Sequence, residues 1–470
     1  MAATAMSGNY VGLSSVLQKL EIPPDFTRYE EITEASTILA LDLWKQSVVG
    51  TLDELLAMLR STGESKLTIK DQGDIVLLCV PFENICPWND ATRSGQRDSW
   101  VAIECTPIAK SILALLPFSC SPQALVSQVL TQNLRPIFRA NPHPHLHTAT
   151  GRKVGKPAGG HLALQDYYED QRWKKYPGIG SVVFWCVQNL ESEAYENIWH
   201  LIIPPIMALL DDYEARYKLQ GVEIVQELLH HVPKGLLSRT GIDGLLRQSL
   251  KNSLSHLQSP ETPQLIRSAI SASVNLTLLT TTVPPAGKPS SDRFDQLSSL
   301  LGEGIISGIW LYAEDKPAVV TATFDALPPL LEALEIGSAR FLQALVPQLT
   351  HALIPRPLVD RDVQMQLSAI RVLETLMDVC KPRMKSWSET MLDGIARCWV
   401  GLYDEEQRDV TVNSEKRPNY LQGRDEVKKR LPKLCSKLVD VCPDVRQNYF
   451  PRFMEADRTL FEGLFIDINS

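Results

Sequence analysis

Four histidines in a polar stretch come closest, by type and spacing, to a reactive site. His143, His145 and His147 alternate along the chain, and His161 follows further on. Alternating side chains of an extended segment lie on one side, and imidazole is a good zinc ligand, so a metal-dependent enzyme is one hypothesis. However, prolines separate these histidines, no carboxylate or cysteine is near them in the sequence, and a structural zinc site needs four ligands. We therefore favour a polar loop that lies over neighbouring helices or docks a partner, with no metal and no cofactor.

A second charged set is Asp211, Asp212 and Lys218. It could be an acidic site for the basic groove of a partner. It could instead be structural, with Asp212 capping the helix that follows and Lys218 reaching an aspartate of a neighbouring repeat. We favour the structural hypothesis. Gly221 is expected to allow close helix contact, although glycine costs about 1 kcal/mol of helix propensity.

The segment Arg239-Thr240-Gly241 follows the expected end of a helix. Gly241 is predicted to be a left-handed turn residue, and Thr240 or Asp243 to cap the next helix. A phosphate-binding loop would need more glycines and a lysine at fixed spacing. The sequence also shows no nucleophile elbow, HExxH, EF-hand loop or Cys–His pairing, so we predict no catalytic, cofactor-binding or metal-binding residues and no enzyme.

These residues lie on a pattern of two helices joined by an acidic turn. Leu201 to Leu210 is almost wholly apolar, as a helix buried between neighbours is, and contains Pro204 and Pro205. After the Asp turn, apolar residues fall on one helical face at Val222, Val225, Leu228 and Leu229. A helix, a short turn and a second amphipathic helix form one HEAT-type unit, which buries its faces only by stacking.

Similar patterns recur along the chain. In residues 345–380 an apolar helix with Pro347 precedes an acidic turn at 360–362. A second helix follows, with one apolar face at Met365, Ala369, Val372, Leu373 and Leu376. A weaker copy is 318–334, with Pro328 and Pro329, and another is 384–439. The fold class predicted is all-α, an irregular HEAT-like helical-repeat solenoid.

The expected organisation has three parts: a helical N-terminal region at 1–140, a His/Pro/Gly-rich loop at 141–162, and the solenoid at 163–470. Further helices are expected at 9–21, 30–60, 75–82 (a buried piece), 108–116 and 122–138. Polar breaks are expected at 61–73, 84–98, 281–294 and 404–424.

Bulk composition narrows the class of protein. The 470 residues are 44% hydrophobic and 22% charged, which is typical of a folded globular chain. The net charge of −8 argues against a general nucleic-acid binder. No signal peptide and no membrane-spanning run is expected. The 9 cysteines lack a CxxC pair, so we expect reduced, buried thiols in a cytoplasmic and nuclear protein.

Aromatic residues offer one candidate contact surface. Trp173 follows a polar run that contains Tyr167 and Tyr168. Tryptophan beside tyrosine and arginine is a common composition of binding hot spots, so these three residues are predicted to be a partly exposed partner contact. Trp185 and Trp199 are expected to pack in the core.

The central third of the chain resembles one family. The segments that carry the resemblance are QDYYEDQRWKKYP (165–177), VVFWCVQNLE (182–191), IWHLIIPPIMALLDDYEARYKLQG (198–221) and LLSRTGIDGLL (236–246). Together they resemble the Tel-two-interacting-protein-two family, the smaller HEAT-like subunit of the Triple T co-chaperone complex. Outside roughly 140–280 the resemblance is limited to helical character.

The resemblance implies a non-catalytic scaffold. Its partners would be two large helical-repeat subunits and, indirectly, phosphatidylinositol-kinase-related kinases and the ninety-kilodalton heat-shock chaperone. Supporting those kinases would connect the chain with TOR signalling, the DNA damage response and telomere maintenance. An alternative is another HEAT-type adaptor, such as a transport receptor or phosphatase scaffold.

Overall fold

The computed structural model describes residues 5–26, 34–62, 67–83, 85–89, 100–117, 120–140, 142–155, 167, 171–281, 291–354, 363–411 and 418–465. Within these ranges every regular element is a helix, apart from one isolated β-bridge between Leu146 and Lys153. The all-α prediction is therefore confirmed. The chain divides into two compact units, Met1–Leu250 and Lys251–Ser470. The His/Pro/Gly-rich loop lies inside the first unit.

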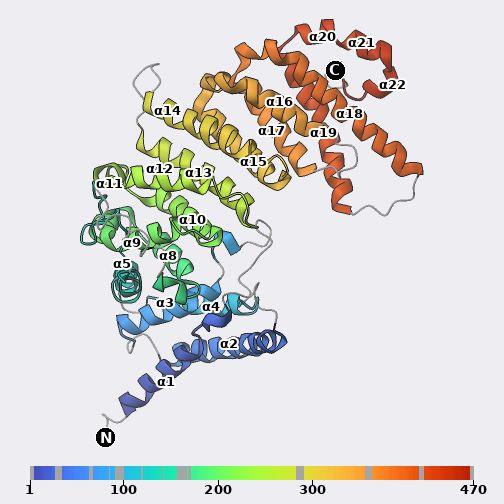
Figure 1. The fold of residues 1–470 in the computed structure, drawn as a ribbon. Coiled ribbons are helices and arrows are strands. Elements are labelled where there is room, and N and C mark those ends of the chain that lie inside the picture. Colours follow the sequence, from blue (N-terminus) through green and yellow to red (C-terminus); the bar gives the residue numbers. More distant parts are fainter. Residues whose placement is uncertain are drawn as a thin grey trace. The chain divides into compact units, whose positions relative to one another are not determined.

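The first unit contains the helices from α1 to α12 (Figure 1). In chain order the longer ones are α1 (Ala5–Lys19), α2 (Ala35–Thr62), α3 (Ile69–Glu83), α4 (Cys105–Leu113), α5 (Pro122–Gln128), α6 (Arg135–Phe138), α8 (Ile179–Gln188), α9 (Tyr195–Leu210), α10 (Ala215–His231), α11 (Lys234–Thr240) and α12 (Ile242–Ser253), within which the division falls. Shorter pieces are η1 (Pro24–Phe26), η3 (Pro87–Asn89), the π-helical η4 (Val129–Leu134), η5 (Arg172–Lys175) and η6 (Ser192–Ala194). The helix expected at 122–138 is thus one run, α5–η4–α6, with a π-helical middle.

The core of the first unit forms where apolar helix faces meet. The expected buried helix piece at 75–82 lies in α3, where Ile75, Cys79 and Phe82 are fully buried, so this prediction is confirmed. Around them packs a cluster from α1, α2 and α4 that includes Leu20, Leu52 and Ile112. The eight-residue apolar run reads as a strand by composition alone, but burial on several sides of a helix gives the same composition.

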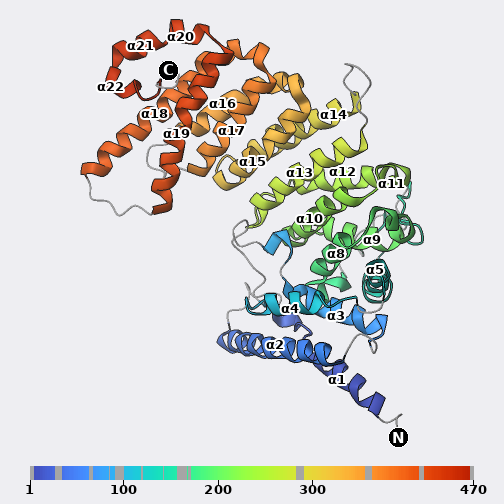
Figure 2. The ribbon, with the colours of Figure 1, turned by 180° about the vertical axis from the view of Figure 1, so that it is seen from behind.

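The second unit is a row of helix pairs. Its helices are α13 (Thr262–Thr280), α14 (Ser291–Ser299), the π-helical η7 (Leu300–Trp310), α15 (Pro317–Leu334), η8 (Glu335–Phe341), α16 (Leu342–Leu353), α17 (Val363–Val379), η9 (Lys381–Trp387), α18 (Ser388–Thr411), α19 (Pro418–Val441), α20 (Asp444–Asn448), α21 (Phe450–Ala456) and α22 (Arg458–Phe461). Helices α13, α15, α17 and α19 lie side by side in that order, and α14, α16 and α18 each pack against the next member of the row (Figures 1 and 2). This alternation of two layers is the HEAT-like arrangement predicted.

Some of the expected boundaries change. Residues 318–334 are not a helix pair but the single helix α15, because no turn residue interrupts their apolar pattern. The polar segment 404–424 is largely helical, since α18 runs to Thr411 and α19 begins at Pro418. The polar break at 61–73 is shorter than predicted, because α3 begins at Ile69. The acidic turn at 360–362 and most of the break at 281–294 lie outside the described residues.

The cysteines follow the prediction of buried thiols. All 9 are free, and all but Cys120 are buried. Burial raises the pKa of the Cys435 thiol to about 12, which keeps it protonated and unreactive at neutral pH. No helix in the described part of the chain combines the length and apolarity needed to cross a membrane.

Candidate functional site

The turn between α9 and α10 is where the charged residues singled out in the sequence meet. Helix α9 ends at Leu210 with Asp211 at its C-cap, and α10 begins at Ala215 after Glu214 at its N-cap. The four predicted apolar positions of α10 are buried. A helix–turn–helix unit at 201–229 is therefore confirmed, with Pro204 and Pro205 inside the first helix.

Gly221 sets the distance between the two helices. A Cβ atom at this position would lie 2.4 Å from the backbone nitrogen of Leu210 and 2.5 Å from its Cα. Real Cβ atoms do not come so close, so the helices can touch here only because residue 221 has no side chain. The close contact predicted for Gly221 is confirmed.

Lys218 supplies a hydrogen bond to a carbonyl at the C-terminal end of α9. Its side chain is buried, and Nζ donates a hydrogen bond of 2.8 Å to the carbonyl oxygen of Leu210. Carbonyls in the last turn of a helix lack intrahelical partners, so this bond closes α9 against its own partner helix. Burial lowers the pKa of Lys218, while the carboxylates of Asp211 and Asp212 oppose that shift. The prediction that Lys218 reaches an aspartate of a neighbouring repeat is wrong.

Asp212 supports the turn from inside. It is 2% exposed, and Oδ1 accepts a 2.8 Å hydrogen bond from the backbone N–H of Glu214. The predicted cap is therefore displaced: Glu214 occupies the N-cap position, and Asp212 holds the N-cap residue itself, as an Asx-turn does. Burial raises the pKa of Asp212, and the hydrogen bond from Lys174 acts against the rise.

Lys174 of η5 is the cation of this group, which we call the turn node: Lys174, Asp211, Asp212 and Glu214. Its Nζ lies 2.9 Å from Oδ1 and 2.8 Å from Oδ2 of Asp212, and 2.8 Å from Oε1 of Glu214. It also sits 4.1 Å from the ring centroid of Tyr213, within cation–π range. Burial alone would lower the pKa of Lys174, but the two carboxylates outweigh it and raise the pKa. Burial alone would raise the pKa of Glu214, but Lys174 outweighs burial, and the pKa of Glu214 is lowered.

The aromatic residues beside Lys174 are buried, contrary to prediction. Trp173 is 1% exposed, stacks on Phe138 at 6.1 Å between ring centroids, and meets Tyr217 edge-on at 4.9 Å. Its indole N–H donates to the side chain of Gln171. Tyr167 is buried as well. The predicted exposed surface is therefore wrong for Trp173 and Tyr167. Aromatic side chains of α6 and α10 cover Trp173, and His143 packs edge-on against Tyr167 at 5.3 Å between ring centroids. Tyr168 lies outside the described residues.

Two tryptophans, Trp185 and Trp199, were predicted to pack in the core. Trp199 is buried, as expected. Trp185 is only half-buried in α8. The most exposed aromatic side chain at the turn is Tyr213, at 64%. No sequence signal separates this tyrosine from the half-buried Tyr217, since both belong to the same polar stretch.

The His/Pro/Gly-rich loop packs onto the turn node. His143 is buried, and its Nε2 lies 2.9 Å from Oδ2 of Asp211, while its Nδ1 accepts from the backbone N–H of His145. Because Nδ1 accepts, the proton of a neutral His143 is on Nε2 and is donated to Asp211. The fold thus supplies the carboxylate that the sequence lacks near these histidines. Burial lowers the pKa of His145, and the neighbouring His143 adds to the effect.

The rest of the loop is tied to α11 rather than arranged as a metal site. The N–H of Lys153 donates to the carbonyl of Thr240 at 3.0 Å. His147 pairs with the Thr150 hydroxyl at 3.0 Å. Across the described ranges, no three His, Cys, Asp or Glu side chains are grouped as metal ligands would be, and His161 lies outside those ranges.

The Arg239-Thr240-Gly241 segment ends α11 as expected. Gly241 has φ of 72°, so the predicted left-handed turn residue is confirmed. The Thr240 hydroxyl donates backwards to the carbonyl of Leu236 at 2.7 Å and so serves α11, which makes the prediction of Thr240 as a cap of the next helix wrong. Asp243 lies in the first turn of α12. Here too the polar groups are used to end and join helices.

A family model described as the Tti2 family matches residues 91–361, which include the turn node and the helices from α4 to α16. The chain is similar to the TELO2-interacting protein 2 of Rattus norvegicus and that of Mus musculus, each 28% identical over 98 residues. The match covers 21% of this chain and only 19% of each relative. A structure of Kap121p bound to Pho4p matches 93% of this chain and 36% of that chain at 12% identity, with a TM-score of 0.47, which is too low to bear on the fold.

Proposed function

This chain belongs to the Tti2 family, and we propose that it acts as a non-catalytic scaffold subunit of the Triple T co-chaperone complex. The observation that supports the proposal is the family match itself, which spans more than half of the chain and takes in the turn node. The stacked helix pairs of the second unit agree with it, because proteins built from such pairs present extended surfaces to other proteins.

The partners under this proposal are two large helical-repeat proteins. One of them would be a protein of the TELO2 kind, after which the rodent relatives are called TELO2-interacting protein 2. Holding these partners together would support the folding, stability and assembly of phosphatidylinositol-kinase-related kinases, with the heat-shock chaperone acting indirectly. Neither nucleic acid nor membrane is part of the proposed role, and the proposed location is cytoplasm and nucleus, which imaging of a fluorescently tagged chain tests.

The turn node gives this role a physical basis. Each of its charged groups has a partner: Lys174 pairs with the carboxylates of Asp212 and Glu214, and Asp211 pairs with His143 of the loop. These pairs fix the angle between α9, α10 and the loop 142–155, so the surface offered to a partner is preorganised and little conformational entropy is lost on binding.

The test is affinity purification of the tagged full-length chain from its own cells, with mass spectrometry of the proteins that accompany it. We expect two large helical-repeat subunits in near-equal amount, with kinases of the stated group and chaperones in smaller amount. A HEAT-repeat protein of another family, carrying the same tag, controls for generic adhesion. Recovery of the chain alone, or with transport or phosphatase subunits instead, contradicts the proposal.

A further inference from the structure

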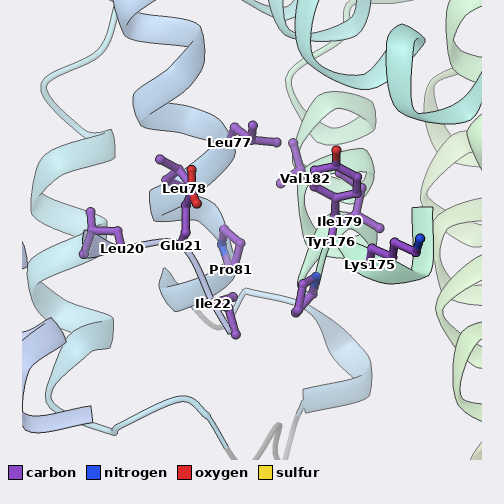
Figure 3. Close-up of a pocket in the computed structure, with 11 residues that line it drawn as sticks. Leu20, Glu21, Ile22, Leu77, Leu78, Pro81, Lys175, Tyr176, Ile179 and Val182 are labelled. Carbon is purple, nitrogen blue, oxygen red and sulfur yellow. The ribbon is translucent and has the colours of Figure 1, made fainter. Parts of the chain in front are cut away.

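A pocket of about 380 Å³ lies in the first unit, outside the turn node. Three segments line it: the residues that directly follow α1, one side of α3, and the stretch from η5 into α8 (Figure 3). The lining residues are Leu20, Glu21 and Ile22; Leu77, Leu78 and Pro81; and Lys175, Tyr176, Pro177, Ile179 and Val182. Apart from Glu21 and Lys175, these side chains are apolar or aromatic.

The walls of the pocket are held by a close backbone contact. Gly178 precedes α8 with φ of 76°, a left-handed conformation that favours glycine. A Cβ atom at this position would lie 2.6 Å from Cβ of Pro81 in α3. The start of α8 is therefore seated directly on α3, and the pocket is bounded by two fixed elements.

The lining is apolar but not fully covered. Leu77, Leu78 and Ile22 are half-buried, and Tyr176 is 48% exposed. Ligand sites are typically concave, mostly apolar and about 300–1,000 Å³ in volume. This pocket is at the lower end of that range, which suits one or two inserted side chains better than a large ligand.

The charges at its rim are available to a partner. Glu21 is exposed on the α1 side, and Lys175 is exposed on the opposite wall (Figure 3). Within the described part of the chain, neither forms an ion pair with another residue. The adjacent Lys174 differs, because two carboxylates neutralise it. A partner segment with a basic residue toward Glu21 and an acidic residue toward Lys175 would therefore meet an opposite charge on each side of the apolar pocket.

We propose that this pocket receives an apolar side chain from a partner protein, on a segment with a basic residue toward Glu21 and an acidic residue toward Lys175. The inference rests on the proposed function only in taking the occupant to be a protein. It goes beyond that function by naming the surface and the chemistry of the segment. Apolar anchors in a pocket with a charged rim are the usual arrangement of a binding hot spot.

The test places the photo-crosslinker p-benzoylphenylalanine at Tyr176 in the full-length chain, expressed in its own cells. The replacement is aromatic and half-exposed, so it should not disturb the fold. The same substitution at Tyr312, which is 66% exposed in the second unit, is the matched control. After irradiation, mass spectrometry identifies the linked peptide. The crosslink is then repeated in a chain that carries both Glu21→Lys and Lys175→Glu, two exposed changes that leave the net charge unaltered.

We expect one partner peptide, absent from the Tyr312 control, with an apolar residue flanked by a basic and an acidic one. Reversing both rim charges should lower its yield about tenfold. The proposal is overturned if the linked peptide lacks these charges, or if charge reversal leaves the yield unchanged. It is also overturned by a crosslink to a small molecule or to a second copy of this chain, or by a yield no higher than at Tyr312. A matching peptide from a protein that is neither a Triple T subunit nor one of the stated kinases or chaperones would keep the pocket proposal and contradict the proposed function.

Discussion

Replacing Lys174 with methionine should destabilise the first unit by removing the ammonium group that pairs directly with the carboxylate of Asp212. Methionine keeps the length and packing of the aliphatic stem but has no charge. The carboxylate of Asp212 would then remain buried, with the backbone N–H of Glu214 as its remaining hydrogen-bond donor among the described contacts. An uncompensated buried charge is among the most costly single defects in a folded protein.

The expected loss of stability depends on how well water can solvate the two carboxylates that Lys174 leaves behind. Breaking a buried ion pair by removing one member costs about 3–5 kcal/mol. The side chain of Asp212 is 1% exposed, so water cannot replace the lost ammonium there, whereas Glu214 is 29% exposed and regains part of its hydration. We therefore expect a loss of about 3 kcal/mol, at the lower end of that range, which corresponds to roughly a hundredfold change in an opening equilibrium.

The assay is amide hydrogen exchange of the full-length chain, read at α9 and α10. A site-resolved measurement is needed because a chain of two compact units need not unfold in one step. Amides of these two helices should exchange about a hundred times faster in Lys174→Met than in the parent chain. Lys175→Met is the matched control, since it is adjacent and exposed, and it should change these rates little.

The stability lost in Lys174→Met should depend on pH in a direction set by Asp212. Burial raises the pKa of Asp212, and loss of Lys174 removes the strongest effect that opposes that rise and leaves the hydrogen bond from the Glu214 N–H. A carboxyl whose folded pKa lies above its unfolded value contributes stability at low pH and loses it as pH rises through the folded pKa. The deficit of Lys174→Met should therefore be largest near neutral pH and shrink on acidification. Adding Asp212→Asn, which removes the buried charge but keeps an oxygen for the Glu214 N–H, should restore most of the protection. Equal effects of Lys174→Met and Lys175→Met, or no rescue by Asp212→Asn, would refute this account.

Three other substitutions test the helix contacts, each by amide hydrogen exchange of the helices concerned, which reports their local free energy of opening. Gly221→Ala should lower that free energy by about 3 kcal/mol, because α9 and α10 must separate. Gly50→Ala, with open space around it in α2, should raise it by about 0.5–1 kcal/mol, and equal effects would contradict the close-contact argument. Trp310→Phe should lower it by about 1–2 kcal/mol by removing the 2.8 Å hydrogen bond from its indole N–H to the Thr323 hydroxyl, and unchanged exchange in η7 and α15 would show that this bond contributes nothing. Asp325→Ala should cost about 1–2 kcal/mol by removing a carboxylate shared between helices, and a gain in stability would show that its desolvation outweighs its bonds.

Local patterns in the sequence predicted the helices well. The period of Val222, Val225 and Leu228 specified one buried face, and burial in the structure follows it. Gly221 and Gly241 were also predictable, because glycine in these settings has a steric reason that belongs to the immediate backbone. Such patterns indicate which face of its own helix a residue occupies and where that helix ends.

Partners distant in the chain could not be predicted in this way. Trp173 was expected to be exposed because its neighbours are polar, but Phe138 and Tyr217 cover it from other helices. His143 finds Asp211 at a separation of 68 residues, and Lys174 finds Asp212 at 38. No local rule connects positions so far apart, so His143, Asp211 and Asp212 were identified without their partners, and Lys174 was missed.

The idea that aspartates join neighbouring helices is nonetheless realised, with different cations. In the second unit, Oδ2 of Asp325 in α15 lies 2.9 Å from Arg267 of α13, and Oδ1 lies 3.2 Å from Arg371 of α17. Oδ1 also accepts a 2.6 Å hydrogen bond from Ser368 of α17. One carboxylate thus connects three successive helices of the row, and Asp212 similarly joins the α9–α10 turn to η5. A carboxylate with fixed partners on both sides resists sliding of the helices past one another, whereas apolar faces alone tolerate several registers. In irregular repeats, whose apolar faces differ from pair to pair, such shared aspartates are therefore the residues that best define the stacking geometry, and with it the surface available to a partner.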